Sequence, residues 1–167
     1  PSIDTFGERA EYIRYGLDFS LFQSNVESYL RETDGHIVFI CTLNNLALAG
    51  LKDFWEYLLD LKRTFGAKGQ WISVTTEVLI GPEWQNINIL PDSFKKYLED
   101  TIDYVKQNLG ADLTHFSSFE LMGLERALSM MTSKPENLER ARKNFYLFFS
   151  EHDKRRRTNI LKVFPEI

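Results

Sequence analysis

Cysteine and long apolar runs are the two features that this sequence has least of. Cys41 is the only cysteine in 167 residues, which excludes an internal disulfide framework and any metal site built from cysteines alone within the chain. No apolar run approaches the roughly 20 residues that cross a bilayer, and the first residues lack the basic-then-apolar pattern of a secretory signal. These absences predict a cytoplasmic protein without a membrane partner.

A surplus of positive charge is also missing. Lys and Arg number 20 against 24 Asp and Glu, so the formal net charge is −4. Because phosphate backbones are bound through a surplus of Lys and Arg on one face, the composition argues against nucleic acid as a partner. The exception is the basic run 154–157. It is interpreted as the last turn of a helix, as a nucleic-acid-binding tail, or as the source of one arginine in an active-site or interdomain ion pair.

Short apolar runs alternate with helical periodicities in the first half of the chain. The run "IVFIC", residues 37–41, is typical of a parallel strand covered on both faces, and "QWISVTT", residues 70–76, predicts a second strand. Between them an apolar stripe predicts a helix over residues 51–66. The opening "PSID" has the pattern of the end of a strand without the residues that would begin that strand, so we expect the chain to begin inside a domain.

The second half of the chain is helical. A helix is predicted over residues 92–109 with Asp92 as its N-cap, and the last helix is expected to open with Pro135 in its first turn. The predicted fold is therefore α/β: a partial (β/α) barrel with parallel strands in residues 1–90, followed by an all-helical C-terminal extension in residues 91–167. Three strands cannot close a barrel, so an open sheet with two free edges is expected.

Four segments of the chain together carry a resemblance to a known family. In order they read "PSIDTFGERAEYIRYGLDFSLFQSNVESYL", "FICTLNNLALAGLKDFWEYLLDLK", "ILPDSFKKYLE" and "EHDKRRRTNILKVFPEI". They resemble the C-terminal half of radical S-adenosylmethionine proteins of the twitch-domain-containing type. The first is similar to the region that starts at their fourth barrel strand, the second to their fifth strand and its helix, the third to the helix entry beyond the sixth strand, and the last to their C-terminal ending. The resemblance covers nearly the whole chain.

This resemblance implies a portion of an enzyme that uses S-adenosylmethionine and a 4Fe-4S cluster for radical chemistry on a small molecule or peptide. The family's CxxxCxxC motif is absent, and the cluster requires its three thiolates. The chain alone is therefore expected to bind neither cofactor, to hold no metal and to have no catalytic residue. Its implied partner is the remainder of the barrel, whether an N-terminal half or a separate chain. The alternative is a non-catalytic module that pairs its open sheet edge with another polypeptide.

The resemblance also implies roles for residues near the N-terminus. Ser2 and Asp4, at the end of the fourth-strand equivalent, would bind polar parts of the cofactor. The next residue departs from the family pattern, because Thr5 stands where glycine is usual and adds a side chain where close backbone approach is needed. Arg14 in "EYIR" would lie near a cofactor or substrate anion; a surface ion pair with a nearby glutamate is the alternative.

Polar residues also follow the two predicted strands. Thr42 and Asn44 come after "IVFIC", and Glu77 comes after "SVTT". Because the carboxyl ends of parallel strands face the ligand in such folds, Thr42 and Asn44 are predicted to contact the cofactor, and Glu77 the cofactor or substrate. A turn or helix cap is the alternative role for Asn44. Cys41 is predicted to be a buried small hydrophobic residue and not a nucleophile.

Overall fold

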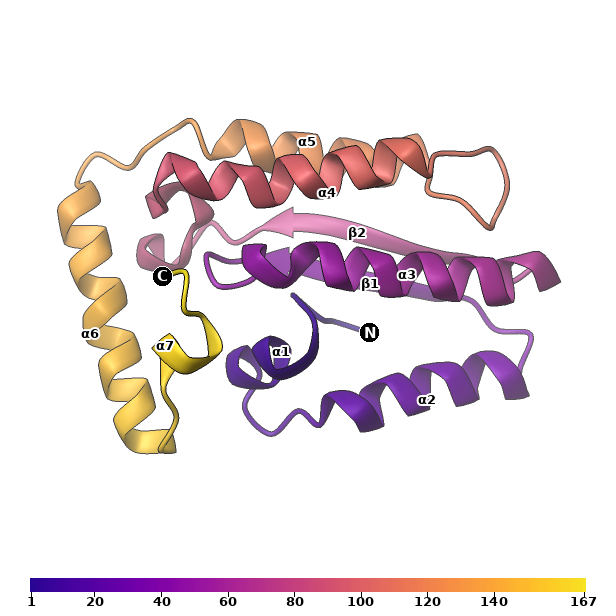
Figure 1. Ribbon diagram of the computed structural model, residues 1–167, viewed down its shortest axis with the longest axis horizontal. Helices are drawn as coiled ribbons and strands as arrows, with labels where there is room; N and C mark the ends of the chain where they lie inside the picture. Colours follow the sequence, from indigo (N-terminus) through magenta and orange to yellow (C-terminus); the bar gives the residue numbers. More distant parts are fainter.

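A computed structural model describes all residues, 1–167. Two parallel strands lie in the middle of the molecule, with helices around them (Figure 1). The strands are β1 (Ile37–Leu43) and β2 (Ile72–Val78). The helices are α1 (Gly7–Ile13), α2 (Phe19–Glu32), α3 (Leu51–Phe65), α4 (Lys95–Gln107), α5 (Ser118–Met130), α6 (Leu138–Arg156) and α7 (Ile160–Val163). The prediction of a mixed, helix-rich fold with parallel strands is confirmed.

The sheet has three parallel segments with β1 at its centre. β1 and β2 pair in register from Ile37 beside Ile72 onward. On the other edge of β1, the N-terminal segment forms a single parallel bridge. There the Ile3 amide donates to the Ile40 carbonyl at 3.0 Å, and the Ile40 amide donates to the Pro1 carbonyl at 2.8 Å. The first of the three expected strands is thus reduced to a short contact.

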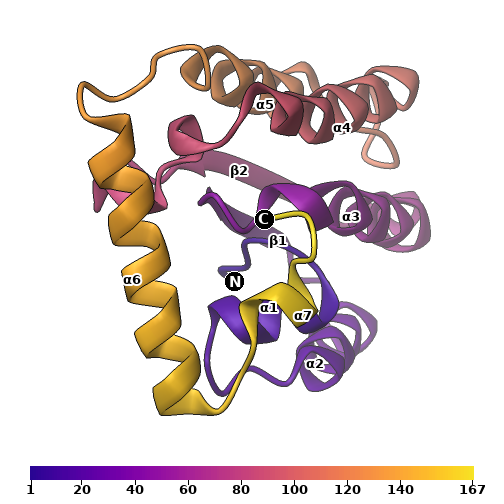
Figure 2. The same ribbon diagram turned by 60° about the vertical axis from the view of Figure 1, so that its left-hand side comes forward.

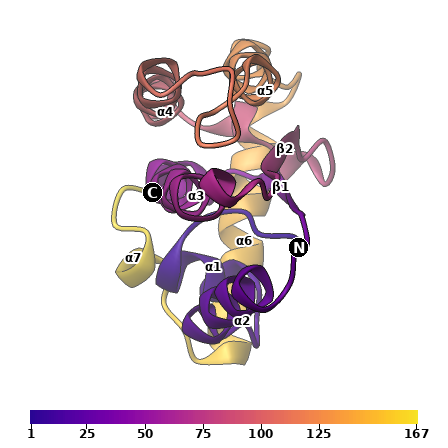
Figure 3. The ribbon, with the colours of Figure 1, turned by 90° about the vertical axis from the view of Figure 1, so that its right-hand side faces the viewer.

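Helices cover only one face of this sheet. Phe39 of β1 packs on that face against Phe22 of α2 and Phe54 of α3. On the opposite face Val38 and Ile40 remain 39% and 49% exposed. Figure 3 shows α3 on one side of the strands and no helix on the other. The expectation that this strand is covered on both faces is wrong, because no other element of the chain packs against the second face.

Residues before and after residue 90 share one hydrophobic core. Phe54 and Val74, from the first half of the chain, belong to the same buried cluster as Leu98 of α4 and Leu124 of α5. α4 packs against α3, and α5 packs against α4 and β2 (Figure 1). Burying these apolar side chains together is the main favourable term in folding, so α4 and α5 are integral to the core that supports the strands.

A buried ion pair joins α3 to α5. The Nζ of Lys62 lies 3.1 Å from Oε1 of Glu120, and the two side chains are 4% and 1% exposed. Each charge has a further partner: Lys62 donates to the Ile72 carbonyl at 2.6 Å, and Glu120 accepts from the Val74 amide at 3.1 Å. Glu120 also completes the capping box with Ser117 that begins α5.

These contacts close the outer edge of β2. The Val74 amide points away from β1, where another strand would otherwise pair, and Glu120 accepts its hydrogen bond instead. Further along the same edge, Arg126 donates to the Thr76 carbonyl at 3.0 Å. Side chains of α5 therefore occupy the positions of a neighbouring strand. The sheet has one free edge, which is the edge formed by the N-terminal segment beside β1.

The long helix α6 stands across the carboxyl ends of the strands (Figures 1 and 2). It begins with Asn137 as its N-cap, so the expectation that Pro135 lies in the first turn is wrong. Asp92 is not an N-cap either: it opens a 3₁₀ turn, and α4 starts after Phe94. Lys154, Arg155 and Arg156 of the basic run lie in the last turn of α6, as one interpretation predicted, and Arg157 is its C-cap. Their positive charges interact favourably with the negative end of the helix dipole. No helix is both long and apolar enough to span a membrane.

The Lys62–Glu120 pair gives a test of this fold. In Lys62→Met the Glu120 carboxylate stays buried without its cation, so we expect the free energy of unfolding to fall by about 3–5 kcal/mol. The control is Lys52→Met on the same helix, whose exposed pair with Glu56 spans 3.9 Å and should matter by less than about 0.5 kcal/mol. Urea denaturation measures both. Equal effects of the two substitutions would contradict a structural role for the buried pair.

Candidate functional site

A polar pocket of about 390 Å³ lies between the strand ends and α6. We call it the strand-end pocket. Its sheet side carries Asp4, Thr42 and Asn44, and its α6 side carries His152 and Arg156. Arg14, at the C-terminal end of α1, also lines it. The carboxyl ends of parallel strands are the usual ligand-binding end of α/β folds, and this pocket occupies that position.

Four of the predicted residues form one hydrogen-bonded network. Arg14 makes a bidentate ion pair with the buried Asp4 carboxylate, with Nε at 3.0 Å and Nη2 at 2.9 Å from its oxygens. The same Nη2 donates to the Ser2 hydroxyl at 2.8 Å. The Thr42 amide donates to Asp4 at 3.3 Å, so Asp4 joins the N-terminal segment to β1. Arg14 pairs with Asp4, and the alternative of a pair with a nearby glutamate is wrong.

Asn44 has a turn role and also lines the pocket. Its Oδ1 accepts from the Leu46 amide at 3.0 Å, which fixes the turn that follows β1. Its Nδ2 makes no hydrogen bond within the chain and remains available as a donor. The two roles proposed for this residue from sequence are therefore compatible.

Glu77 lies away from the other predicted residues. It sits beside Thr42 in the strand register. Its carboxylate nevertheless pairs with Arg126 of α5 at 2.8 Å and lines a different, smaller cavity with Met122. The structure thus brings together five of the six predicted residues and leaves Glu77 at the outer edge of β2.

His152 of α6 was missed from sequence, whereas Arg156 belongs to the basic run, for which an active-site arginine was one interpretation. Nη1 of Arg156 lies 2.7 Å from Nε2 of His152, and because a guanidinium only donates, Nε2 is the acceptor and Nδ1 carries the proton. Burial and, next, the Arg156 charge lower the pKa of His152. Arg156 also lies 4.5 Å above the Tyr15 ring. The i,i+4 spacing of His152 and Arg156 is the signal that could have indicated a shared helix face.

Asp153 fixes the position of α6 against the pocket. Its carboxylate accepts hydrogen bonds from Tyr12 of α1 at 2.8 Å, from the Thr158 hydroxyl at 2.7 Å and from the Ile160 amide of α7 at 2.8 Å. Burial pushes the pKa of Asp153 upward, but these hydrogen bonds outweigh burial and hold the pKa below its ordinary value of 3.8. Burial first, and then the Asp153 charge and hydrogen bond, raise the pKa of Tyr12.

The residues do not fit an iron-sulfur cluster. Cys41, the only thiol, is fully buried with Sγ 3.6 Å from the Asp4 carbonyl, and burial raises its pKa. Its predicted role as a small buried residue is confirmed. No group of three or more His, Cys, Asp or Glu side chains is arranged to hold a metal ion. The strand-end pocket does suit a polar organic ligand, because its cations and amides can bind carboxylate and hydroxyl oxygens.

Comparisons with known proteins assign no family to this chain. No protein-family model matches the chain, and no match was found among curated proteins or solved structures. A functional proposal therefore rests on the strand-end pocket and on the arrangement of the elements around it.

Asp153→Asn tests the support of the pocket. Replacing the carboxylate removes charge-assisted hydrogen bonds, so we expect a loss of about 1–3 kcal/mol in unfolding free energy at neutral pH. Because the folded-state pKa is depressed, this contribution is present above pH 3.8 and disappears as acid protonates Asp153. The difference between wild type and variant should therefore shrink below pH 3.8. The control is Asp103→Asn on the exposed face of α4. A difference independent of pH would contradict the role given to the carboxylate.

Proposed function

We propose that the chain is the C-terminal portion of a radical S-adenosylmethionine enzyme. In this proposal its three parallel segments are part of a partial (β/α) barrel, and the strand-end pocket holds the polar part of S-adenosylmethionine. One observation carries it: Ser2, Asp4 and Arg14, named from the resemblance, converge at one site with Thr42 and Asn44, which were predicted from the strand ends. Such convergence supports a common ligand, since these residues come from separate parts of the chain.

The residues have distinct roles in this proposal. Asp4 orients the Arg14 guanidinium through two hydrogen bonds, so that the arginine is pre-organised for an anionic group. Nδ2 of Asn44 donates to a hydroxyl or carboxylate oxygen of the cofactor. In the complete protein, S-adenosylmethionine held here would supply radical chemistry together with a 4Fe-4S cluster. The thiolates for that cluster come from outside residues 1–167, because Cys41 is the only cysteine here.

The uneven edges of the sheet support a partner on one side. The outer edge of β2 is closed by α5, so barrel strands can be added only next to the N-terminal segment. There, an open groove of about 550 Å³ runs between α2 and β1 and is lined by Phe22, Tyr29 and Val38. We place the remaining barrel strands along this groove. The lone buried thiol of Cys41 agrees with the proposed cytoplasmic location.

The same free edge favours a second candidate function. A non-catalytic module that pairs with a separate chain would use the same groove and the exposed Val38 and Ile40. The nucleic-acid alternative has less support, because two cations of the basic run pair with a carboxylate within α6. Arg155 pairs with Glu151 at 2.8 Å, and Lys154 lies 3.9 Å from the same carboxylate.

The enzyme proposal is tested first at the level of the gene and then of binding. We expect a CxxxCxxC loop to be encoded in frame upstream of Pro1 or in an adjacent reading frame. In the cluster-loaded protein, Arg14→Gln should weaken binding of S-adenosylmethionine about tenfold or more, since a charge-assisted contact to its anionic group is lost. Arg31→Gln, which disturbs only an exposed pair on α2, is the matched control. Absence of the loop, or equal affinities of the two variants, would sink the proposal.

The module alternative makes a separate prediction when the loop is encoded on another polypeptide. Val38→Lys places a charge on the uncovered sheet face and should weaken association of the two chains about tenfold or more. Leu21→Lys, at an exposed site on α2, is the control. Co-purification and sedimentation of the mixed chains measure the effect. Association that tolerates both substitutions would place the interface elsewhere.

A further inference from the structure

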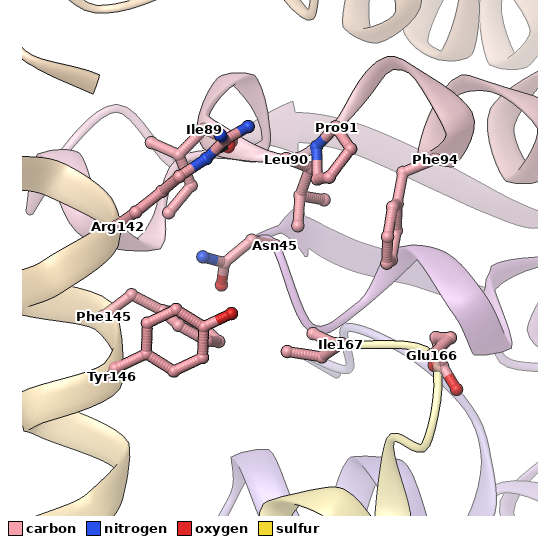
Figure 4. A pocket seen from close by; sticks show the side chains of 10 residues that line it. All are labelled: Asn45, Ile89, Leu90, Pro91, Phe94, Arg142, Phe145, Tyr146, Glu166 and Ile167. Atoms are coloured by element: carbon pink, nitrogen blue, oxygen red, sulfur yellow. Dashed lines mark hydrogen bonds between the residues drawn. The ribbon is translucent and has the colours of Figure 1, made fainter. Parts of the chain in front are cut away.

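A second cavity lies beside the turn that follows β1. Its volume is about 190 Å³, and its walls come from that turn, from residues 89–94, from α6 and from the last two residues of the chain (Figure 4). We call it the side pocket. Asn44 lines the strand-end pocket, whereas its neighbour Asn45 lines the side pocket. The two consecutive asparagines therefore serve two different cavities.

Asn45 has a buried, unpaired acceptor in the wall of this cavity. The residue is 2% exposed, and its Nδ2 donates to the Trp84 carbonyl at 2.9 Å. This bond fixes the amide orientation, because the reversed amide would place two oxygens against each other. Its Oδ1 is buried and has no hydrogen-bond partner. Figure 4 shows the amide in the middle of the lining side chains. A buried carbonyl without a donor is unfavourable, so the site calls for a ligand that donates a hydrogen bond.

Arg142 brings a positive charge to the side pocket. Nε of Arg142 on α6 donates to the Ile89 carbonyl at 2.7 Å, and no carboxylate lies within ion-pair distance of this guanidinium. The Tyr146 hydroxyl, one turn further along α6, points toward the middle of the cavity (Figure 4). Glu166 does not offset the charge, because its carboxylate is held by Arg9 at 3.0 Å. An anionic ligand is therefore favoured.

The remaining walls are apolar and limit the size of the ligand. Leu90, Pro91, Phe94 and Phe145 form these walls. The volume corresponds to about six water molecules at roughly 30 Å³ each, which is the size of an amino acid. A short hydrocarbon group would fill the apolar part without unpaired polar atoms.

We propose that the side pocket binds a small carboxylic acid that carries an amine or hydroxyl next to the carboxylate and a short apolar side chain. Arg142 and the Tyr146 hydroxyl bind the carboxylate, the Asn45 carbonyl accepts from the amine or hydroxyl, and the apolar walls contact the side chain. This site is separate from the proposed cofactor site, since none of these residues lines the strand-end pocket.

A matched set of small probes tests the ligand chemistry on the full chain. Titrations followed by ¹⁵N NMR use L-leucine and 2-hydroxy-4-methylpentanoate as complete probes. 4-Methylpentanoate lacks the donor, and 3-methylbutylamine lacks the carboxylate. We expect saturable shifts around Asn45 with at least one complete probe, and affinities about tenfold or more lower for both incomplete probes. No saturable binding, or equal binding of all four, would overturn the proposal.

Variants on one helix face then locate the site. Arg142→Gln should weaken binding of the better complete probe about tenfold, and Tyr146→Phe, which removes only the hydroxyl, should weaken it severalfold. Arg140→Gln is the matched control, because Arg140 lies on the same helix and its only ion pair, with Glu83, spans 3.9 Å. Thermal melting confirms that the variants are folded. Binding that is unchanged in Arg142→Gln, or weakened equally in Arg140→Gln, would place the ligand outside the side pocket.

Discussion

The buried pair of Lys62 and Glu120 is the constraint on which the rest of the structure depends. Two charges removed from water are tolerated only when each has further hydrogen-bond partners, and here those partners are the Ile72 carbonyl and the Val74 amide of β2. The pair therefore holds α3, α5 and β2 in one arrangement. Because α5 is fixed in this place, its side chains close one edge of the sheet, and the strand ends keep their position relative to α6.

The placement of α6 turns the strand ends into two cavities. Asp153 joins α6 to Tyr12 of α1 and to the start of α7. These contacts fix the position of α6 across the ends of the strands. One part of its inner side meets the sheet residues of the strand-end pocket, while Arg142 and Tyr146 border the side pocket. The turn with Asn44 and Asn45 separates the two cavities. A single short turn therefore sets the geometry of both.

Local patterns in the sequence predicted most of the elements and part of the site. The apolar stripe of α3 and the runs of β1 and β2 follow from periodicity, and the parallel order placed Thr42 and Asn44 at a ligand-facing end. The failures involve contacts between distant segments. Asp92 and Pro135 have helix-start propensities that the tertiary structure overrides. Nothing local indicates that Lys62 would meet Glu120, or that His152 and Arg14 would line the same pocket.

The unequal edges of the sheet also bear on self-assembly. A fibre that grows by strand addition needs two complementary edges on every copy, so that each molecule can be followed by the next. Here the β2 edge is occupied by Glu120 and Arg126, and only the edge beside the N-terminal segment is free. If two copies paired through this edge, the one free edge of each copy would be occupied. Pairing of this kind stops at a symmetric dimer, so the same contacts that stabilise the fold also act against open-ended polymerisation.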